Sequence, residues 1–225
     1  MMVADVPIRP AATVVCARAG DSPAAAPEYL LLQRSSRQAF MPDLWVFPGG
    51  RVDPEDGPEG HLETFRQTAW REALEEAGLT LPRTAWPEFA RWVTPIGERR
   101  RYDTRFFLAT VPRSLSAVAV DAAEVVAARW LAADAALACH RMGTLALAPP
   151  TWATLSALAA HGTLEAAVRW ADGLSSPEPL TPTRTTWRGR LAVRWAGGAL
   201  WFAPIAQAAG EAGAWEPLHE APDAP

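Results

Sequence analysis

Three glutamates stand close together in a stretch that favours a helix: Glu72, Glu75 and Glu76. No residue from 63 to 77 breaks a helix, and Gly78 is a typical residue for the C-terminal end. At about 100° per residue, the three side chains share one stripe of that helix. Carboxylates at about 4 Å repel by roughly 4 kcal/mol per pair at an effective dielectric constant of about 20. A hard divalent cation such as Mg²⁺ or Mn²⁺ removes this repulsion, so the stripe is a candidate metal site. The alternative is a solvated acidic helix face. The opposite side of the helix is expected to be buried through Trp70, Ala73, Leu74 and Ala77.

The residues around these glutamates resemble the signature of the Nudix hydrolase family. That signature is a glycine, five residues, a glutamate, seven residues, and then Arg-Glu-apolar-x-Glu-Glu-x-Gly-apolar. The chain matches its second part at Glu63, Arg71, Glu72, Glu75, Glu76, Gly78 and Leu79. Phe47-Pro48-Gly49-Gly50 is similar to the usual lead-in, but Gly50 lies about seven residues too far from Glu63. We therefore expect an inserted loop over residues 51–62, in which Gly57 has the literal spacing by coincidence.

The resemblance implies a role for each position of the motif. The metal ligands would be Glu63, Glu72, Glu75 and Glu76, and the ion would be Mg²⁺ or Mn²⁺. The catalytic residues would be Glu72, Glu75 and Arg71, with the identity of the general base left open. Arg71 would join the loop to the helix by a charge-assisted bond to a carboxylate. The substrate-binding residues would be Gly49, Gly50, Arg34 and Arg105, with the two glycines letting the backbone approach the phosphates.

Several residues near the motif have two interpretations each. The run 99–101 of three arginines could bind phosphates or form a solvated turn. Asp103 and Arg105 share a strand face, so they could pair with each other or face the site. Glu124 could add a carboxylate. Trp86 or Tyr102 could stack on a base. Four other tryptophans are expected in the core: Trp45, Trp70, Trp92 and Trp130.

Other segments are similar to the Nudix branch that contains peroxisomal coenzyme A diphosphatases. They are the ranges 31–35, 40–42, 46–53, 100–107 and 147–151, and the likeness covers about residues 10 to 205. The fuller coenzyme A signature expects Arg and Gly ahead of the Pro-Gly-Gly, where this chain has Ala39 and Asp43. The resemblance implies a metal-dependent pyrophosphohydrolase that acts on a nucleoside diphosphate linked to another group. Coenzyme A or acyl-coenzyme A is the first candidate substrate. The alternatives are hydrolysis of NADH, ADP-ribose or nucleoside triphosphates, a non-catalytic ligand sensor, or an interaction scaffold.

The composition excludes several other classes of protein. Among the 225 residues, with a net charge of −4, all 21 basic residues are arginine and no lysine occurs, which excludes Schiff-base chemistry and a P-loop lysine. A mildly acidic chain does not favour nucleic acid as a partner. Two cysteines form neither a disulfide framework nor a zinc module. Pro149-Pro150 interrupts the uncharged range 142–160, so we expect no membrane span and a cytoplasmic protein. A Trp-rich surface would favour a homodimer.

The remaining pattern predicts the elements that position the motif. Strands are expected at 11–18, 28–34, 89–94, 102–111 and 124–131, and helices at 63–77, 132–142 and 151–171. Residues 44–47 lead into a break at Pro48-Gly49-Gly50. A Pro-rich linker over 173–186 would precede a hairpin of strands 190–195 and 199–202 around Gly197-Gly198, with a loose end from Gly210. The predicted fold is α+β, a Nudix α/β/α sandwich with a mixed sheet plus a C-terminal helix and hairpin. It forms one domain over residues 1–225, with a core of about 10–172 and a C-terminal extension over 173–225.

Overall fold

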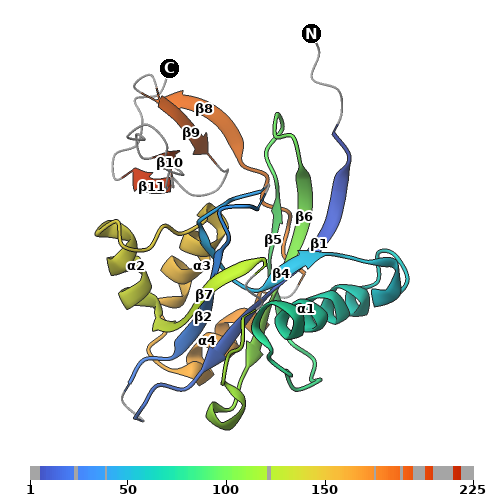
Figure 1. Cartoon of the computed structure of the whole chain (residues 1–225), viewed down its shortest axis with the longest axis vertical. Helices are drawn as coiled ribbons and strands as arrows, with labels where there is room; N and C mark the ends of the chain where they lie inside the picture. The colour runs from blue at the N-terminus through green and yellow to red at the C-terminus, as the bar shows by residue number, and fades with distance from the viewer. Residues whose placement is uncertain are drawn as a thin grey trace.

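A mixed sheet of seven strands is the centre of the protein in the computed structural model (Figure 1). The structure describes residues 6–22, 25–38, 40–120, 123–174, 176–187, 190–194, 201–204 and 215–218. The strands are β1 (Ile8–Arg18), β2 (Glu28–Arg34), β3 (Trp45–Val46), β4 (Gly49–Arg51), β5 (Glu88–Val93), β6 (Arg101–Thr110) and β7 (Val125–Ala132). Their order is β3-β2-β1-β6-β5, with β4 paired to β1 and β7 paired to β2. β1 and β6 run parallel and the other pairs are antiparallel. The predicted mixed sheet is therefore confirmed.

Helices cover both faces of this sheet, because alternate residues of β1 point to opposite sides. Val14 and Cys16 pack with α1 (Leu62–Ala77), whereas Val15 and Ala17 belong to the apolar cluster on the other face. That second cluster includes α2 (Ala133–Arg141), α3 (Pro149–Leu158) and α4 (Leu164–Asp172). Both faces of the central strands are thus buried, as their β-branched and apolar sequence favours. The predicted α/β/α sandwich is confirmed.

Helix α1 ends as predicted but buries a different stripe. Gly78 adopts the left-handed conformation, with φ of 66°, and its N–H bonds to the Leu74 carbonyl at 2.9 Å. The apolar side chains that face the sheet are Phe65, Ala69, Ala73 and Ala77. Leu74 is 39% exposed and Trp70 is half-buried, so the prediction that both are buried was wrong. The stripe follows i, i+4 steps from Phe65, and Leu74 lies about 100° away from Ala73 around the axis.

Two predictions for the middle of the chain need correction. The expected helix over 151–171 is two helices, α3 and α4, separated at residues 159–163. Thr163 begins α4, because its hydroxyl accepts a bond from the Ala166 N–H at 3.2 Å. The loop expected over 51–61 contains a short 3₁₀ helix, η1 (Pro54–Asp56), with Pro54 suited to its first position. A second 3₁₀ helix, η2 (Arg113–Leu115), follows β6.

The C-terminal extension forms a second, four-stranded antiparallel sheet. Its strands are β8 (Thr183–Trp187), β9 (Arg190–Arg194), β10 (Trp201–Pro204) and β11 (Trp215–Leu218), in the order β11-β10-β9-β8. β9 and β10 pair as the expected hairpin, but its Gly197-Gly198 turn lies outside the described residues. β8 occupies the end of the expected linker, and β11 lies within the segment expected to be loose. Leu180 ties the extension to β5 through two backbone bonds, to Arg91 and Val93, of 2.7 and 2.8 Å.

Within the described residues, no helix has both the length and the apolar character needed to cross a membrane.

Candidate active site

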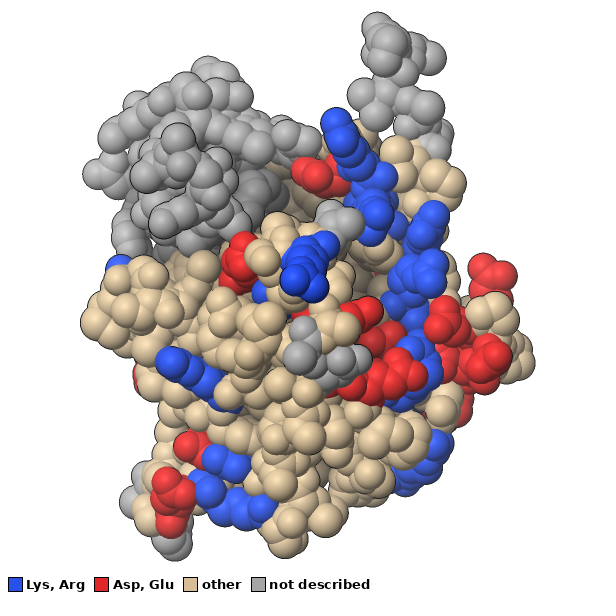
Figure 2. All heavy atoms as spheres, in the orientation of Figure 1, with Lys and Arg blue, Asp and Glu red and all other residues tan. Residues whose placement is uncertain are grey.

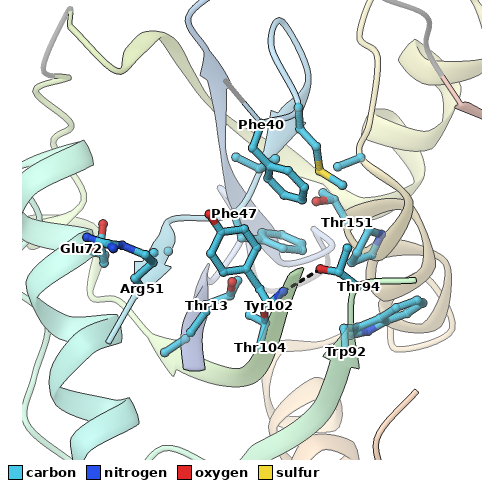
Figure 3. A pocket seen from close by; sticks show the side chains of 18 of the residues that line it. Thr13, Phe40, Phe47, Arg51, Glu72, Trp92, Thr94, Tyr102, Thr104 and Thr151 are labelled. Atoms are coloured by element: carbon cyan, nitrogen blue, oxygen red, sulfur yellow. Dashed lines mark hydrogen bonds between the residues drawn. The ribbon is translucent and has the colours of Figure 1, made fainter. Parts of the chain in front are cut away.

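A cavity of about 880 Å³ opens beside the last two turns of α1 (Figure 3). β4, β6, the segment after β5 and the first turn of α3 supply its other walls. Four glutamates line one part: Glu72, Glu75, Glu76 and Glu124. Aromatic side chains line the part across from Glu72: Phe40, Phe47, Trp92 and Tyr102. The site therefore joins a carboxylate cluster to an aromatic hollow.

Glu76 is the most buried of these carboxylates, at 4% exposure. Burial raises its pKa to about 8, and the neighbouring charges of Glu72 and Glu124 act in the same direction. The N–H of Gly49, which donates to Glu76 Oε2 at 3.0 Å, and the charge of Arg34 act in the opposite direction. The hydrogen bond from β4 thus fixes the position of the Glu76 carboxylate. Ionisation of this group is unfavourable in its surroundings unless a cation lies nearby.

Glu72 lies against the backbone of β4. A side chain at Gly50 would collide with its carboxylate, so any larger residue there would have to displace Glu72. Burial raises the pKa of Glu72, the charge and hydrogen bond of Arg71 counteract this, and the charges of Glu75 and Glu124 add to the increase. Glu72 and Glu76 therefore both have raised pKa values, because of burial first and then repulsion by neighbouring carboxylates.

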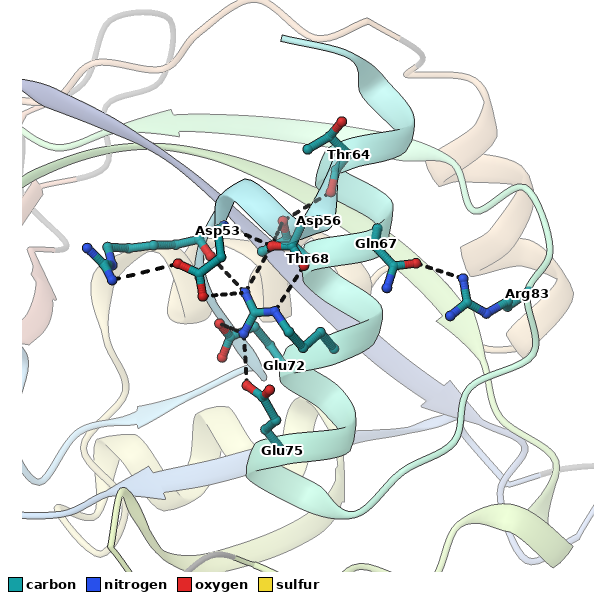
Figure 4. A network of polar contacts seen from close by, with 10 residues as sticks. Asp53, Asp56, Thr64, Gln67, Thr68, Glu72, Glu75 and Arg83 are labelled. Carbon is teal, nitrogen blue, oxygen red and sulfur yellow. Dashed lines mark hydrogen bonds and ion pairs between the residues drawn. The ribbon is translucent and has the colours of Figure 1, made fainter. Parts of the chain in front are cut away.

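The guanidinium of Arg71 lies at the centre of a network of acids (Figure 4). Its Nη1 donates to Glu72 Oε1 and Glu75 Oε2, both at 2.8 Å. Its Nη2 donates to the carbonyl of Arg51 at 3.0 Å, which ties the helix to the end of β4. The hydrogen bond to Asp56, followed by the charges of the glutamates, raises the pKa of Arg71 against the effect of burial. The sequence predicted this joining role for Arg71.

Asp56 is the partner of Arg71 that sequence reasoning missed. Its Oδ1 accepts from Arg71 Nε and its Oδ2 from Nη2, each at 3.0 Å. The side chain of Asp56 is 2% exposed. Glu63, which was expected to be a metal ligand, instead has a side chain that is 79% exposed, and it pairs with Arg66 at 3.4 Å outside the cavity. The signal was available, because Asp56 follows Gly50 after five residues, which is the spacing of the signature.

The structure brings three of the four predicted substrate-binding residues to the cavity. Gly49, Gly50 and Arg34 line it, and Arg34 is held by the Phe40 carbonyl at 3.1 Å. Arg105 is not part of its lining. It pairs with Glu88 at 3.1 Å and lies over the Phe65 ring at 4.6 Å, on the α1 face of the sheet. The period of two along β6 explains this, since Tyr102, Thr104 and Phe106 face the cavity and Arg105 does not.

Contacts decide between the two interpretations of the other side chains near the motif. Asp103 pairs with Arg91 at 2.6 Å, so Asp103 and Arg105 neither pair with each other nor face the site. Glu124 and Tyr102 do line the cavity, and Tyr102 contacts Phe40 edge-on with ring centroids 5.3 Å apart. Trp86 is buried and is not part of the lining, so it cannot stack on a base there.

The arginines at 99–101 lie in different environments, and so do the four tryptophans that were expected in the core. Of the arginines at 99–101, Arg100 lines the cavity, whereas Arg101 is buried and bonds to the Thr94 carbonyl at 3.1 Å. Two tryptophans, Trp45 and Trp92, are in the core. The other two, Trp70 and Trp130, are half-buried under guanidinium groups.

The acids around the cavity have the chemistry of a hard-cation site, because every donor is a carboxylate oxygen. In the described part of the chain, no three acidic, histidine or cysteine side chains converge as metal ligands would. Arg71 Nη1 donates hydrogen bonds to both Glu72 and Glu75, and the Gly49 N–H donates one to Glu76. Burial, and after it repulsion by neighbouring carboxylates, raises the pKa values of Glu72 and Glu76, and a divalent cation would relieve that repulsion.

Fold and site together define a Nudix-type domain, and comparison with known proteins agrees. A model of the NUDIX domain matches residues 7–148, more than half of the chain. The chain therefore belongs to the Nudix family, whose members generally use divalent metals. It is similar to the crystal structure of a NUDIX hydrolase from Alicyclobacillus acidocaldarius, with a TM-score of 0.66 and 27% identity, over 74% of this chain and 97% of that one. It is also 42% identical over 57 residues to "Putative nudix hydrolase 7" of Caenorhabditis elegans. That match covers 25% of this chain and 19% of the relative's length. Family and relatives support the predicted class of enzyme, a Nudix pyrophosphohydrolase.

Proposed function

We propose that this protein is a divalent-metal-dependent pyrophosphohydrolase that cleaves a nucleoside diphosphate linked to another group. The observation that carries this proposal is that glutamates, arginines and aromatic rings all line the same cavity. The carboxylates suit a cation, Arg34 and Arg100 suit phosphate oxygens, and the rings suit an apolar or aromatic group.

The proposed roles follow from position. Glu72, Glu75 and Glu76 would hold Mg²⁺ or Mn²⁺, and Glu63 is left out because it lies outside the cavity. When bound, such an ion polarises phosphorus and lowers the pKa of water. Arg71 orients Glu72 and Glu75 through its bonds of 2.8 Å, and catalysis is assigned to these three residues. The backbone of Gly49 and Gly50 borders the place where phosphates would lie.

Coenzyme A or an acyl-coenzyme A leads our proposed substrates, and NADH, ADP-ribose and nucleoside triphosphates follow. Coenzyme A carries a long non-nucleotide arm beyond its diphosphate, and the aromatic hollow offers an apolar surface for it. Asp43 has a φ of 60°, in the left-handed region that favours glycine. The loop before the Pro-Gly-Gly therefore keeps a conformation that suits the glycine of the coenzyme A signature.

The test is a substrate panel with Mg²⁺ and with Mn²⁺, in which the phosphate-containing products are identified by mass spectrometry. We expect cleavage within a diphosphate. Glu75→Gln and Glu76→Gln should lower kcat by orders of magnitude, since each removes a carboxylate proposed to hold the catalytic cation. Glu59→Gln is the matched control, because Glu59 is an exposed acid of the inserted loop outside the cavity. Binding without cleavage of any diphosphate would contradict the proposal and favour a ligand sensor, and unchanged turnover in both glutamate variants would contradict the site.

A further inference from the structure

Asp56 is a buried carboxylate surrounded by hydrogen-bond donors. Besides both bonds from Arg71, it accepts from the Thr68 hydroxyl at 2.8 Å and from the Asp53 N–H at 2.9 Å. These bonds overcome the effect of burial and lower the pKa of Asp56. A carboxylate with 2% exposure is stable in a protein only when it is bound in this way. Asp56 is therefore ionised and held from three sides.

The consequence for Arg71 is a fixed orientation. A guanidinium is a rigid plane with five N–H donors. Asp56 takes donors from Nε and Nη2, so the plane of Arg71 has no freedom to turn. Nη1 then faces Glu72 and Glu75 at 2.8 Å. The position of the two glutamate carboxylates thus depends on a residue that contacts neither of them in this network.

The path of the chain explains why this acid is Asp56. Five residues separate it from Gly50, as in the signature, but fourteen separate it from Arg71 where the signature has seven. Of the seven surplus residues, 57–61 form a loop and the last two begin α1, and the Thr64 hydroxyl donates to the Pro58 carbonyl at 2.7 Å. The segment carries Glu63 away to the surface, although Glu63 has the correct distance from Arg71 along the sequence.

We propose that Asp56 is the positioning residue that aims Arg71 at the glutamates of the active site, and that Glu63 has no part in the site. This inference rests on the proposed function. Asp56 acts through Arg71 and touches neither substrate nor cation. Partners of this kind change metal affinity or activity by roughly 10- to 100-fold when they are replaced.

The experiment compares Asp56→Asn and Glu63→Gln in the full chain, each of which removes one charge and keeps the side-chain shape. kcat and KM are measured per folded molecule with the best substrate of the panel, and Mn²⁺ affinity is measured by electron paramagnetic resonance. For Asp56→Asn we expect kcat to fall roughly 10- to 100-fold with KM within about threefold, and Mn²⁺ to bind more weakly. Glu63→Gln should stay within about twofold of the unchanged protein in all three quantities, because its side chain is exposed.

The outcomes separate the two proposals. A protein that cleaves nothing in the panel contradicts the proposed function, and the Mn²⁺ affinity of Asp56→Asn still decides the role of Asp56. Should Asp56→Asn fail to fold, Asp56→Glu decides by the same measurements. It keeps the charge but displaces Arg71 by one methylene, and we expect a folded protein with kcat lowered about threefold or more. A kcat and a Mn²⁺ affinity within about twofold of the unchanged protein, or equal losses in the Glu63 and Asp56 variants, would overturn the inference.

Discussion

Glu76 is a deeply buried carboxyl group near the C-terminal end of α1. Its carboxylate accepts a hydrogen bond from the Gly49 N–H at 3.0 Å and has repulsive neighbours in Glu72 and Glu124. A buried group of this kind holds a proton until a cation replaces it. Burial and repulsion raise the pKa values of Glu72 and Glu76, and a bound cation would offset both effects. The raised pKa values are therefore consistent with the proposed metal site.

The stability of the metal-free protein should fall as pH rises from about 4.5 to about 8. The pKa of Glu76 increases from 4.5 when unfolded to about 8 when folded, so the folded protein binds the proton more tightly in this range. Stability is then highest below the unfolded pKa and is lost up to the folded pKa, by roughly 1 kcal/mol for each pH unit. Asp56, with its lowered pKa, changes stability only below about its ordinary value of 3.8. Urea unfolding with a chelator across this range should show the loss, and Glu76→Gln should reduce it, with the remainder due to the raised pKa of Glu72. An equal slope in both proteins would refute the assignment to Glu76.

Strand β4 is the element that joins the sheet to helix α1. It pairs with β1 through Gly49 opposite Thr13 and Gly50 opposite Ala12, while its other contacts reach Glu72 and Glu76 on α1. A Cβ at Gly49 would lie 2.5 Å from the Ala12 carbonyl oxygen and 2.8 Å from Thr13 Cα. Because these are backbone or rigidly held atoms, the strand can come this close to β1 only with glycine.

Gly49→Ala should therefore destabilise the protein by roughly 1–3 kcal/mol, because the added methyl forces β4 away from β1. The same displacement moves the N–H that bonds Glu76, so turnover should decrease as well. Gly162→Ala is the matched control, since nothing lies within 4 Å of its added Cβ and no positive φ is involved. Denaturant unfolding of the two variants tests this. Equal stabilities would mean that the contact between β1 and β4 does not require glycine.

At the scale of the whole molecule, the location of charged side chains says more than their sum. The net charge of −4 predicts little by itself. Figure 2 shows acidic and basic side chains gathered side by side on one face, over the region of α1 and β4. The carboxylates of the cavity and of the network around Arg71 account for acids there, and Arg34, Arg51, Arg71 and Arg100 lie among them. Such a mixed patch suits a cation together with a phosphate.

Mn²⁺ should raise the melting temperature of the whole protein. A ligand that binds only the folded state at about 100 times its Kd adds about 2.7 kcal/mol. For a chain of this size that corresponds to a shift on the order of 5–10 °C. Thermal melts with and without Mn²⁺ measure it, and the double variant Glu75→Gln, Glu76→Gln should lose the shift while Glu59→Gln keeps it. No shift in the unchanged protein would favour an interaction scaffold with an acidic helix of no metal function.

Local pattern predicted β1, β2, β5, β6 and β7 and the core of the motif, but it gave no strand for β3, β4, β8 or β11. β-branched and apolar runs predicted β1 and β2 closely, because strands buried on both faces need such residues. The helical spacing placed Arg71 beside Glu72 and Glu75, because i, i+1 and i, i+4 positions are set by the helix itself. The break between α3 and α4 was missed, since a Thr cap and one glycine are weak signals inside an apolar run.

Contacts between distant segments were decided only by the tertiary structure. The sequence by itself determined that an arginine and three glutamates lie on one helix and that a Pro-Gly-Gly precedes it. It could not determine whether Asp56 or Glu63 binds Arg71, because that depends on how the segment 57–63 folds back. Nor could it determine that Arg105 faces α1, or that Glu76 is buried under β4. These outcomes depend on which elements lie against each face, and packing of the whole sheet decides that.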